Sequence, residues 1–127
     1  MDEQAHLSRR EREIMDVVYA RGEASASDVL ADMLAPPGRT AVRTMLRILE
    51  EKGRLKHYKR GREFIFQPTR PRKRVGQSAL RRVLQTFFDG SLEKAVAAHL
   101  ADTGSKLSEE ELERMAELIR KARERGR

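Results

Sequence analysis

The sequence contains no cysteine and no tryptophan, and only 5% of its residues are aromatic. Without cysteine, the protein cannot form disulfide bonds, thiolate metal sites, iron–sulfur clusters or a cysteine nucleophile. Hydrophobic residues make up 39% of the chain. We therefore expect a modest core that is built mainly from aliphatic side chains.

Long apolar runs are also absent. No stretch approaches the roughly 18 residues that a membrane-spanning helix requires. Residues 1–5 are acidic and polar, and they lack the apolar segment of a secretory signal peptide. We therefore expect a cytoplasmic protein that does not insert into a membrane.

Catalytic and metal-binding patterns are missing as well. The three histidines, His6, His57 and His99, lie far apart, and none has HExxH or another paired-ligand spacing. The serines cluster where helices are expected to begin, and capping accounts for them there. We therefore expect no catalytic residue, no metal and no cofactor, and we do not expect an enzyme.

Positive charge, by contrast, is abundant and concentrated. The 127 residues carry a net charge of +7. Residues 39–74 contain 13 basic and 3 acidic side chains, whereas residues 1–38 contain 4 and 8, and residues 75–127 contain 10 and 9. A localised excess of this kind indicates a binding surface for a polyanion. Nucleic acid is the first candidate and an anionic membrane surface the second.

Two short helices are predicted before the basic window. Residues 8–11 have capping-box spacing, and Gly22 ends the first helix. The second helix starts near Ser25 or Ser27, and the sequence Pro-Pro-Gly at 36–38 stops it. The inward face of this second helix is predicted to hold Val29, Leu30, Met33 and Leu34.

A third helix is predicted from about Arg39 to Lys52, with Gly53 as its C-terminal stop. At about 100° per residue, its two sides differ in character. The inward side holds Val42, Met45, Leu46 and Leu49. Apart from Glu51, the outward side holds only threonine and arginine, namely Thr40, Arg43, Thr44 and Arg47.

Two strands follow, at residues 55–60 and 63–67, and Gly61 supplies the positive φ of a tight hairpin turn. Pro68 and Pro71 prevent regular continuation, so residues 70–74 are predicted to form a basic connector. The remaining residues, 75–127, have the apolar spacing of helices.

Three short helices followed by a hairpin are typical of a winged helix-turn-helix, whose third helix enters the DNA major groove. We therefore predict a mainly α fold with a small β-hairpin, with a DNA-binding domain at 1–70 and a helical dimerisation region at 71–127. The residues of the third helix predicted to bind DNA are Arg39, Thr40, Arg43, Thr44 and Arg47, and the last four of these are predicted to read bases. The residues predicted to contact phosphates from the hairpin are Lys59, Arg60 and Arg62.

The C-terminal helices carry more apolar surface than a short appendage can bury on itself, and a homodimer would cover it. The predicted interface comprises Leu84, Phe87, Phe88, Leu92, Val96, Leu112, Met115 and Ile119. The alternative is that these residues pack on the winged helix in one monomeric core.

Other interpretations of the basic segment remain open. An arginine-rich helix face can simply be solvated. A winged helix can also bind an acidic protein instead of DNA, or it can coat DNA without sequence preference. A salt titration and a comparison of promoter with random DNA would separate these possibilities.

The sequence resembles the BlaI/MecI/CopY-type penicillinase-repressor family over nearly its whole length. The first matching segments are LSRREREIMDVVYARGEASASDVLADM at 7–33, TAVRTMLRILEEKGRLKH at 40–57 and KRGREFIFQP at 59–68. Two more are FFDGSLEKAVAAHL at 87–100 and LSEEELERMAELI at 107–119. The order and spacing of these segments carry the resemblance.

The resemblance implies a homodimeric repressor on a double-stranded DNA operator with dyad symmetry, commonly with TACA/TGTA half-site cores. Val42, Thr44 and Leu49 match the family's recognition-helix pattern, whereas Ala41 and Ile48 replace its frequent threonine and arginine. The resemblance also implies release through a membrane zinc-metalloprotease sensor that triggers cleavage of the dimerisation region.

In the family that cleavage falls at an Asn-Phe bond. The aligned position here is His99-Leu100, which makes these two residues the candidate cleavage region. The copper-responsive branch of the family uses C-terminal cysteines, and the absence of cysteine excludes that branch.

Overall fold

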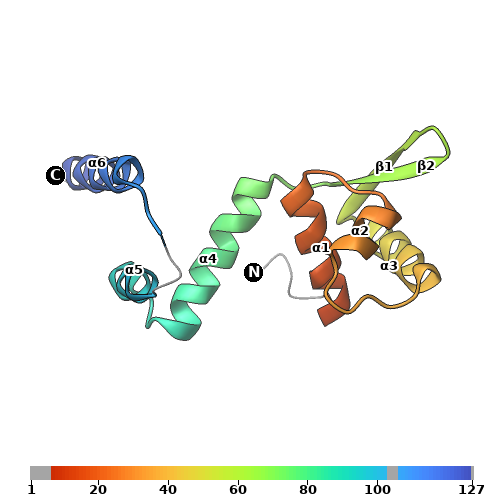
Figure 1. Ribbon diagram of the computed structural model, residues 1–127, viewed down its shortest axis with the longest axis horizontal. Coiled ribbons are helices and arrows are strands. Elements are labelled where there is room, and N and C mark those ends of the chain that lie inside the picture. The colour runs from red at the N-terminus through yellow and green to blue at the C-terminus, as the bar shows by residue number, and fades with distance from the viewer. Residues whose placement is uncertain (1–6, 103–105, 127) are drawn as a thin grey trace. The chain divides into compact units, whose positions relative to one another are not determined.

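The computed structural model describes residues 7–102 and 106–126 (Figure 1). The elements in these ranges are α1 (Arg9–Arg21), α2 (Ala26–Asp32), α3 (Arg39–Glu51), β1 (Leu55–Arg60), β2 (Glu63–Pro68), α4 (Arg72–Phe87), α5 (Leu92–Ala101) and α6 (Glu109–Arg125). The mainly α fold with a small β-hairpin is therefore confirmed. The chain forms two compact units, and the boundary between Arg82 and Val83 lies within α4. The division of DNA binding and dimerisation near residue 70 stays a prediction.

Reciprocal capping starts the first two helices. The Ser8 hydroxyl accepts a hydrogen bond from the Glu11 backbone N–H at 3.1 Å, and the Glu11 carboxylate accepts one from the Ser8 N–H at 2.8 Å. Ser25 and Asp28 make the same pair of bonds at the start of α2. Ser25, and not Ser27, is therefore the cap of α2.

The end of α2 differs from the prediction. The helix stops at Asp32, and the capping residue Met33 is already extended, with ψ of 138°. The Pro-Pro-Gly sequence therefore does not end the helix. Because the chain has left the helical path, the side chain of Leu34 no longer follows the helical period. Leu34 is fully exposed, at 103% of its reference area, and its assignment to the inward face was wrong.

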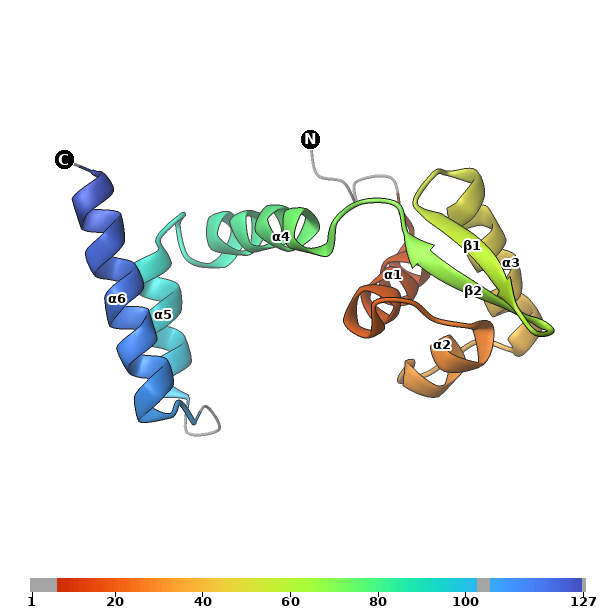
Figure 2. The same cartoon turned by 90° about the horizontal axis from the view of Figure 1, so that it is seen from above.

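The core of the first unit lies between α1, α2, α3 and the hairpin, and it is mainly aliphatic as expected. Its fully buried members include Ile14, Met15, Val18, Val29, Val42, Leu46, Leu49 and Leu55. Figure 2 shows the hairpin beside α3 in this unit. Each helix is too short to be stable alone, so this shared burial holds them in place.

The hairpin is antiparallel, and its register runs from Leu55 opposite Pro68 to Arg60 opposite Glu63. Gly61 has a φ of +66° in the turn, as predicted. β2 was predicted to end at residue 67, but Pro68 is its last residue. A proline is tolerated at this position because it lies at the end of an edge strand.

The basic connector is shorter than expected, because α4 already begins at Arg72. Only residues 70 and 71 of the predicted connector precede the helix, and Arg72, Lys73 and Arg74 form its first turn. Proline at 71 fits this position, since proline is well accepted where a helix starts.

The second unit contains the end of α4 together with α5 and α6. Ser91 caps α5 by accepting a hydrogen bond from the Lys94 N–H, and Ser108 caps α6 through the Glu111 N–H, both at 3.1 Å. Within α5 and α6, which are described in full, no residue is buried. No helix in the described ranges combines the length and apolarity needed to cross a membrane.

Candidate nucleic-acid interface

The third helix is fixed by its apolar side. Val42, Leu46 and Leu49 are completely buried against the rest of the first unit. Because the helical period places other residues opposite them, Thr40, Arg43, Thr44 and Arg47 are all exposed, as predicted. The side chains that were expected to read bases therefore share one solvent-facing surface.

A partly buried ion pair connects the C-terminal end of α3 to α1. The Lys52 ammonium lies 3.0 Å from the carboxylate of Glu11, whose side chain is almost fully buried. Burial raises the pKa of Glu11, but hydrogen bonds from Ser8 and Lys52 outweigh that effect, so its pKa lies below the ordinary value. This carboxylate thereby links the start of α1 to the end of α3.

A groove of about 610 Å³ runs between α3 and the hairpin. It brings Arg39, Arg43 and Arg47 of the helix together with Arg62 of the hairpin turn. The apolar residues that line the same groove are Ala26, Leu46, Phe64 and Phe66. Four arginines from two separate elements thus line one concave surface, together with the acidic residues Glu50 and Glu63.

Other predicted residues lie outside this groove. Thr40 and Thr44 are exposed on α3 but do not line it, and neither do Lys59 and Arg60. Arg39 lines it while donating a hydrogen bond to the Ser27 hydroxyl at 3.2 Å, which ties the start of α3 to α2.

The two faces of the hairpin have different surroundings. His57 and Phe66 pair on the face that lines the groove, with ring centroids 5.6 Å apart. Phe64 lies on the same face, and the Lys59 ammonium sits 5.7 Å from its ring centroid. Arg60 is on the opposite face, where its guanidinium lies 3.5 Å from the Glu23 carboxylate. The three predicted phosphate ligands of the hairpin therefore have three different environments.

Three residues of this region were not predicted. His57 contacts the Glu50 carboxylate at 2.5 Å on the groove wall, and Phe64 remains half exposed beside it. Glu23 bonds to several hairpin side chains. Part of this arrangement could have been predicted from the sequence. Side chains alternate between the two faces of a strand, so His57 lies on one face, and Tyr58 and Arg60 lie on the other.

The predicted dimer-interface residues lie on the surface of the second unit. Phe87, Leu92 and Ile119 are exposed by 73%, 59% and 61%. Leu112 is also exposed, and the half-buried members are Leu84, Phe88, Val96 and Met115. His99 and Leu100 are exposed near the end of α5. No cluster of three or more metal-ligating side chains occurs among residues 7–102 and 106–126.

Comparison with known proteins matches this arrangement to a described family. The chain is 25% identical over 121 residues to a penicillinase repressor from Bacillus licheniformis, and the alignment covers 94% of this chain and 93% of that protein. The family model described as penicillinase repressor matches residues 7–121. Because that match extends from the start of α1 well into α6, the chain belongs to the penicillinase repressor family, a family of DNA-binding transcriptional repressors.

Proposed function

We propose that this protein represses transcription as a homodimer that binds an operator with dyad symmetry. In each protomer α3 enters the major groove, and the hairpin holds the adjacent phosphates. The observation that carries this proposal is the groove in which three arginines of α3 and Arg62 of the hairpin converge.

The chemistry of the α3 surface fits base recognition. Arg43 and Arg47 lie one helical turn apart, and a guanidinium can bind guanine O6 and N7 with two parallel hydrogen bonds. Thr40 and Thr44 offer a methyl group to thymine and a hydroxyl to phosphate or base. Arg39, Lys59, Arg60 and Arg62 supply positive charge to the phosphates on either side.

Dimerisation is supported by the second unit. An exposed apolar surface of this kind needs a covering partner, and a second copy of the chain can provide one. In a two-fold dimer the same patch covers itself, and the two recognition helices then address two related half-sites. A dyad operator follows from this symmetry.

Release of the operator by proteolysis completes the proposal. The bond between His99 and Leu100 lies near the end of α5, and Leu100 is half exposed. A cut there would separate α6 from the rest of the dimerisation region and so weaken the dimer. A membrane metalloprotease sensor is the proposed source of that signal.

The proposal is tested by selecting duplexes from a random library with the purified protein. We expect a two-fold-symmetric consensus, a 2:1 protein-to-duplex complex in sedimentation, and an affinity that falls with salt by a log–log slope of about −0.9 per phosphate contacted. Equal affinity for selected and scrambled duplexes would indicate non-specific coating. Absence of binding to any duplex would favour a protein-binding winged helix.

A further inference from the structure

The turn between α1 and α2 is hydrogen-bonded to the hairpin. Gly22 ends α1 with a φ of +88°, a conformation that favours glycine. Two residues later, Ala24 and Phe66 exchange both backbone hydrogen bonds, at 3.0 and 2.8 Å. The turn is therefore joined to β2 by a single antiparallel bridge between Ala24 and Phe66.

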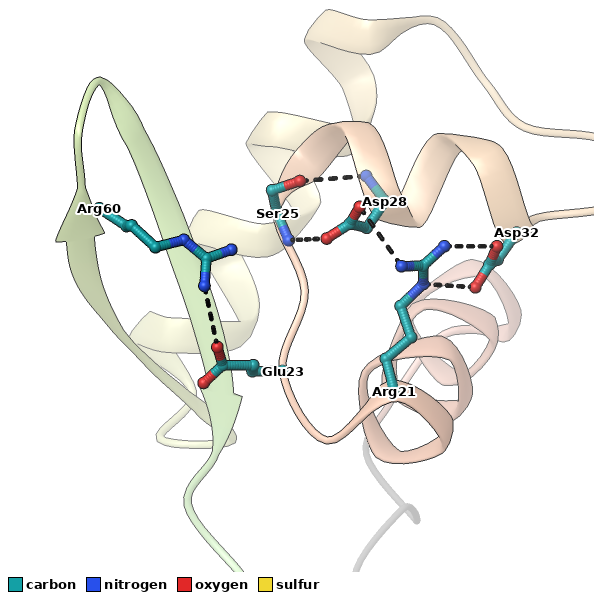
Figure 3. Close-up of polar contacts among 6 residues, drawn as sticks. All are labelled: Arg21, Glu23, Ser25, Asp28, Asp32 and Arg60. Atoms are coloured by element: carbon teal, nitrogen blue, oxygen red, sulfur yellow. Dashed lines mark hydrogen bonds and ion pairs between the residues drawn. The ribbon is translucent and has the colours of Figure 1, made fainter.

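Glu23 extends this attachment to side chains of both strands. Its carboxylate accepts hydrogen bonds from the Tyr58 hydroxyl at 2.7 Å and from the Gln67 amide at 3.0 Å. The Arg60 guanidinium approaches the same carboxylate at 3.5 Å (Figure 3). Tyr58 and Arg60 come from β1 and Gln67 from β2, so a single carboxylate contacts side chains of both strands.

The same turn is fastened to α2 on its other side. Arg21 donates two hydrogen bonds to Asp32, at 2.6 and 2.9 Å, and lies 3.4 Å from Asp28 (Figure 3). Asp28 in turn closes the capping box with Ser25. Glu23 therefore connects the hairpin to a turn that is fixed against both α1 and α2.

We propose that Glu23 is a positioning residue for DNA binding, which holds the hairpin at the angle where Arg62 and the α3 arginines contact one DNA segment. This inference rests on the proposed function. A two-stranded hairpin is only marginally stable by itself, so its orientation depends on such attachments. The hairpin carries the phosphate ligands, and a change in its angle would remove phosphates from reach.

The negative charge of Glu23, taken alone, predicts that removing this side chain would strengthen DNA binding, whereas the positioning role predicts that it would weaken binding. A carboxylate near Arg60 repels phosphate, so charge alone would make its removal improve binding. Two observations favour positioning. The shortest contacts of the carboxylate are to the neutral groups of Tyr58 and Gln67. The Arg60 side chain stays 62% exposed despite its pairing, so it is still free to reach phosphate.

The experiment compares E23A, E23Q, Y58F and E13A with the wild type in the full-length chain, using a duplex selected by the wild-type protein. Glu23 and Glu13 have similar side-chain exposure, 36% and 39%, so E13A removes the same charge without touching the hairpin. Y58F removes one hydrogen bond to Glu23 and changes no charge. Melting curves establish that each variant is folded at the temperature of the titration.

We expect E23A to bind the selected duplex about tenfold more weakly, since hydrogen bonds to a charged acceptor are lost. Its salt slope should become shallower by about 0.9 for each phosphate that is released. Y58F should also bind the selected duplex more weakly than the wild type. E23Q keeps an acceptor oxygen and should bind at least as tightly as the wild type. E13A should leave the salt slope unchanged.

The inference is overturned if E23A and E23Q both bind more tightly than the wild type with steeper slopes, because Glu23 would then act only through its charge. Wild-type affinity and slope in both E23A and Y58F would also overturn it, while leaving DNA binding intact. If the wild-type protein selects no duplex, the proposed function itself fails and the inference fails with it.

Discussion

The two units of this chain bury their apolar residues in different ways. The first unit encloses Ile14, Val42 and Leu46 completely among three helices and a hairpin. The second unit exposes most of Phe87, Leu92 and Ile119, and α5 and α6 contain no buried residue. The first unit therefore contains its own stabilising core, whereas the second leaves much of its apolar surface exposed.

The two isoleucines Ile14 and Ile119 make the sharpest test of this difference. Ile14→Ala should destabilise the first unit by about 2–5 kcal/mol, because a fully buried side chain leaves a cavity. This loss should be the same at every protein concentration. Ile119→Ala should lower the unfolding midpoint only where the dimer forms, so its effect should grow with concentration.

Urea denaturation over a hundredfold range of concentration measures both effects. A concentration-independent loss for Ile119→Ala would mean that this side chain is buried within a single chain. The comparison between the two units would then break down, and the monomeric packing of the C-terminal helices would be the better interpretation.

Substitutions at two leucines test whether the exposed apolar surface of the second unit forms the dimer interface. Leu92→Glu places a charge in the proposed interface and should convert the dimer to monomer, weakening association at least about a hundredfold, because a charge buried without a partner costs several kcal/mol. Leu34→Glu makes the same change at a fully exposed leucine of the first unit and should leave association unchanged. Sedimentation velocity at several concentrations distinguishes the two. Dimers in both variants would place the interface elsewhere.

An arginine pair tests whether base recognition belongs to the first unit alone. Arg47→Ala should reduce discrimination between the selected and a scrambled duplex by about 1–3 kcal/mol, which is the value of one base contact. Arg114→Ala removes the same charge from α6 and should leave discrimination unchanged. Competition titrations at fixed salt measure both. A uniform loss of affinity with intact discrimination would assign Arg47 to phosphate.

Much of the first unit could be predicted from the sequence, because its signals are local. Capping serines and the alternation of Val42, Leu46 and Leu49 with arginine fix the helix boundaries and their inward faces. Leu34 was misplaced because the apolar period continues in the sequence after the backbone has left the helix. Arg72 to Arg74 were misplaced because Pro71 was taken to prevent regular structure, whereas a proline is well accepted where a helix starts.

The sequence predicts which helix and which hairpin form the candidate site, but it does not predict the side-chain contacts between them. Which residues face outward from α3 follows from the helical period, so their exposure was foreseen. The attachment of Glu23 to the hairpin joins residues 35 and 44 positions apart, and no local pattern encodes that distance. The pairing of Glu11 with Lys52, 41 positions apart, is of the same kind.

The pairing of Glu11 with Lys52 gives the smallest expected effect and tests whether charge also contributes to the closed core of the first unit. The folded pKa of Glu11 is lowered, so its stabilising contribution is complete above the unfolded value near 4.5 and is lost as the pH falls through the folded pKa. Glu11→Gln should therefore cost about 1 kcal/mol at pH 7 and much less at pH 3. Glu13→Gln, at a half-exposed position of the same helix, should show no such difference. Unfolding free energies at the two pH values measure the contrast, and an equal cost at both would show that the bond acts through packing and not through charge.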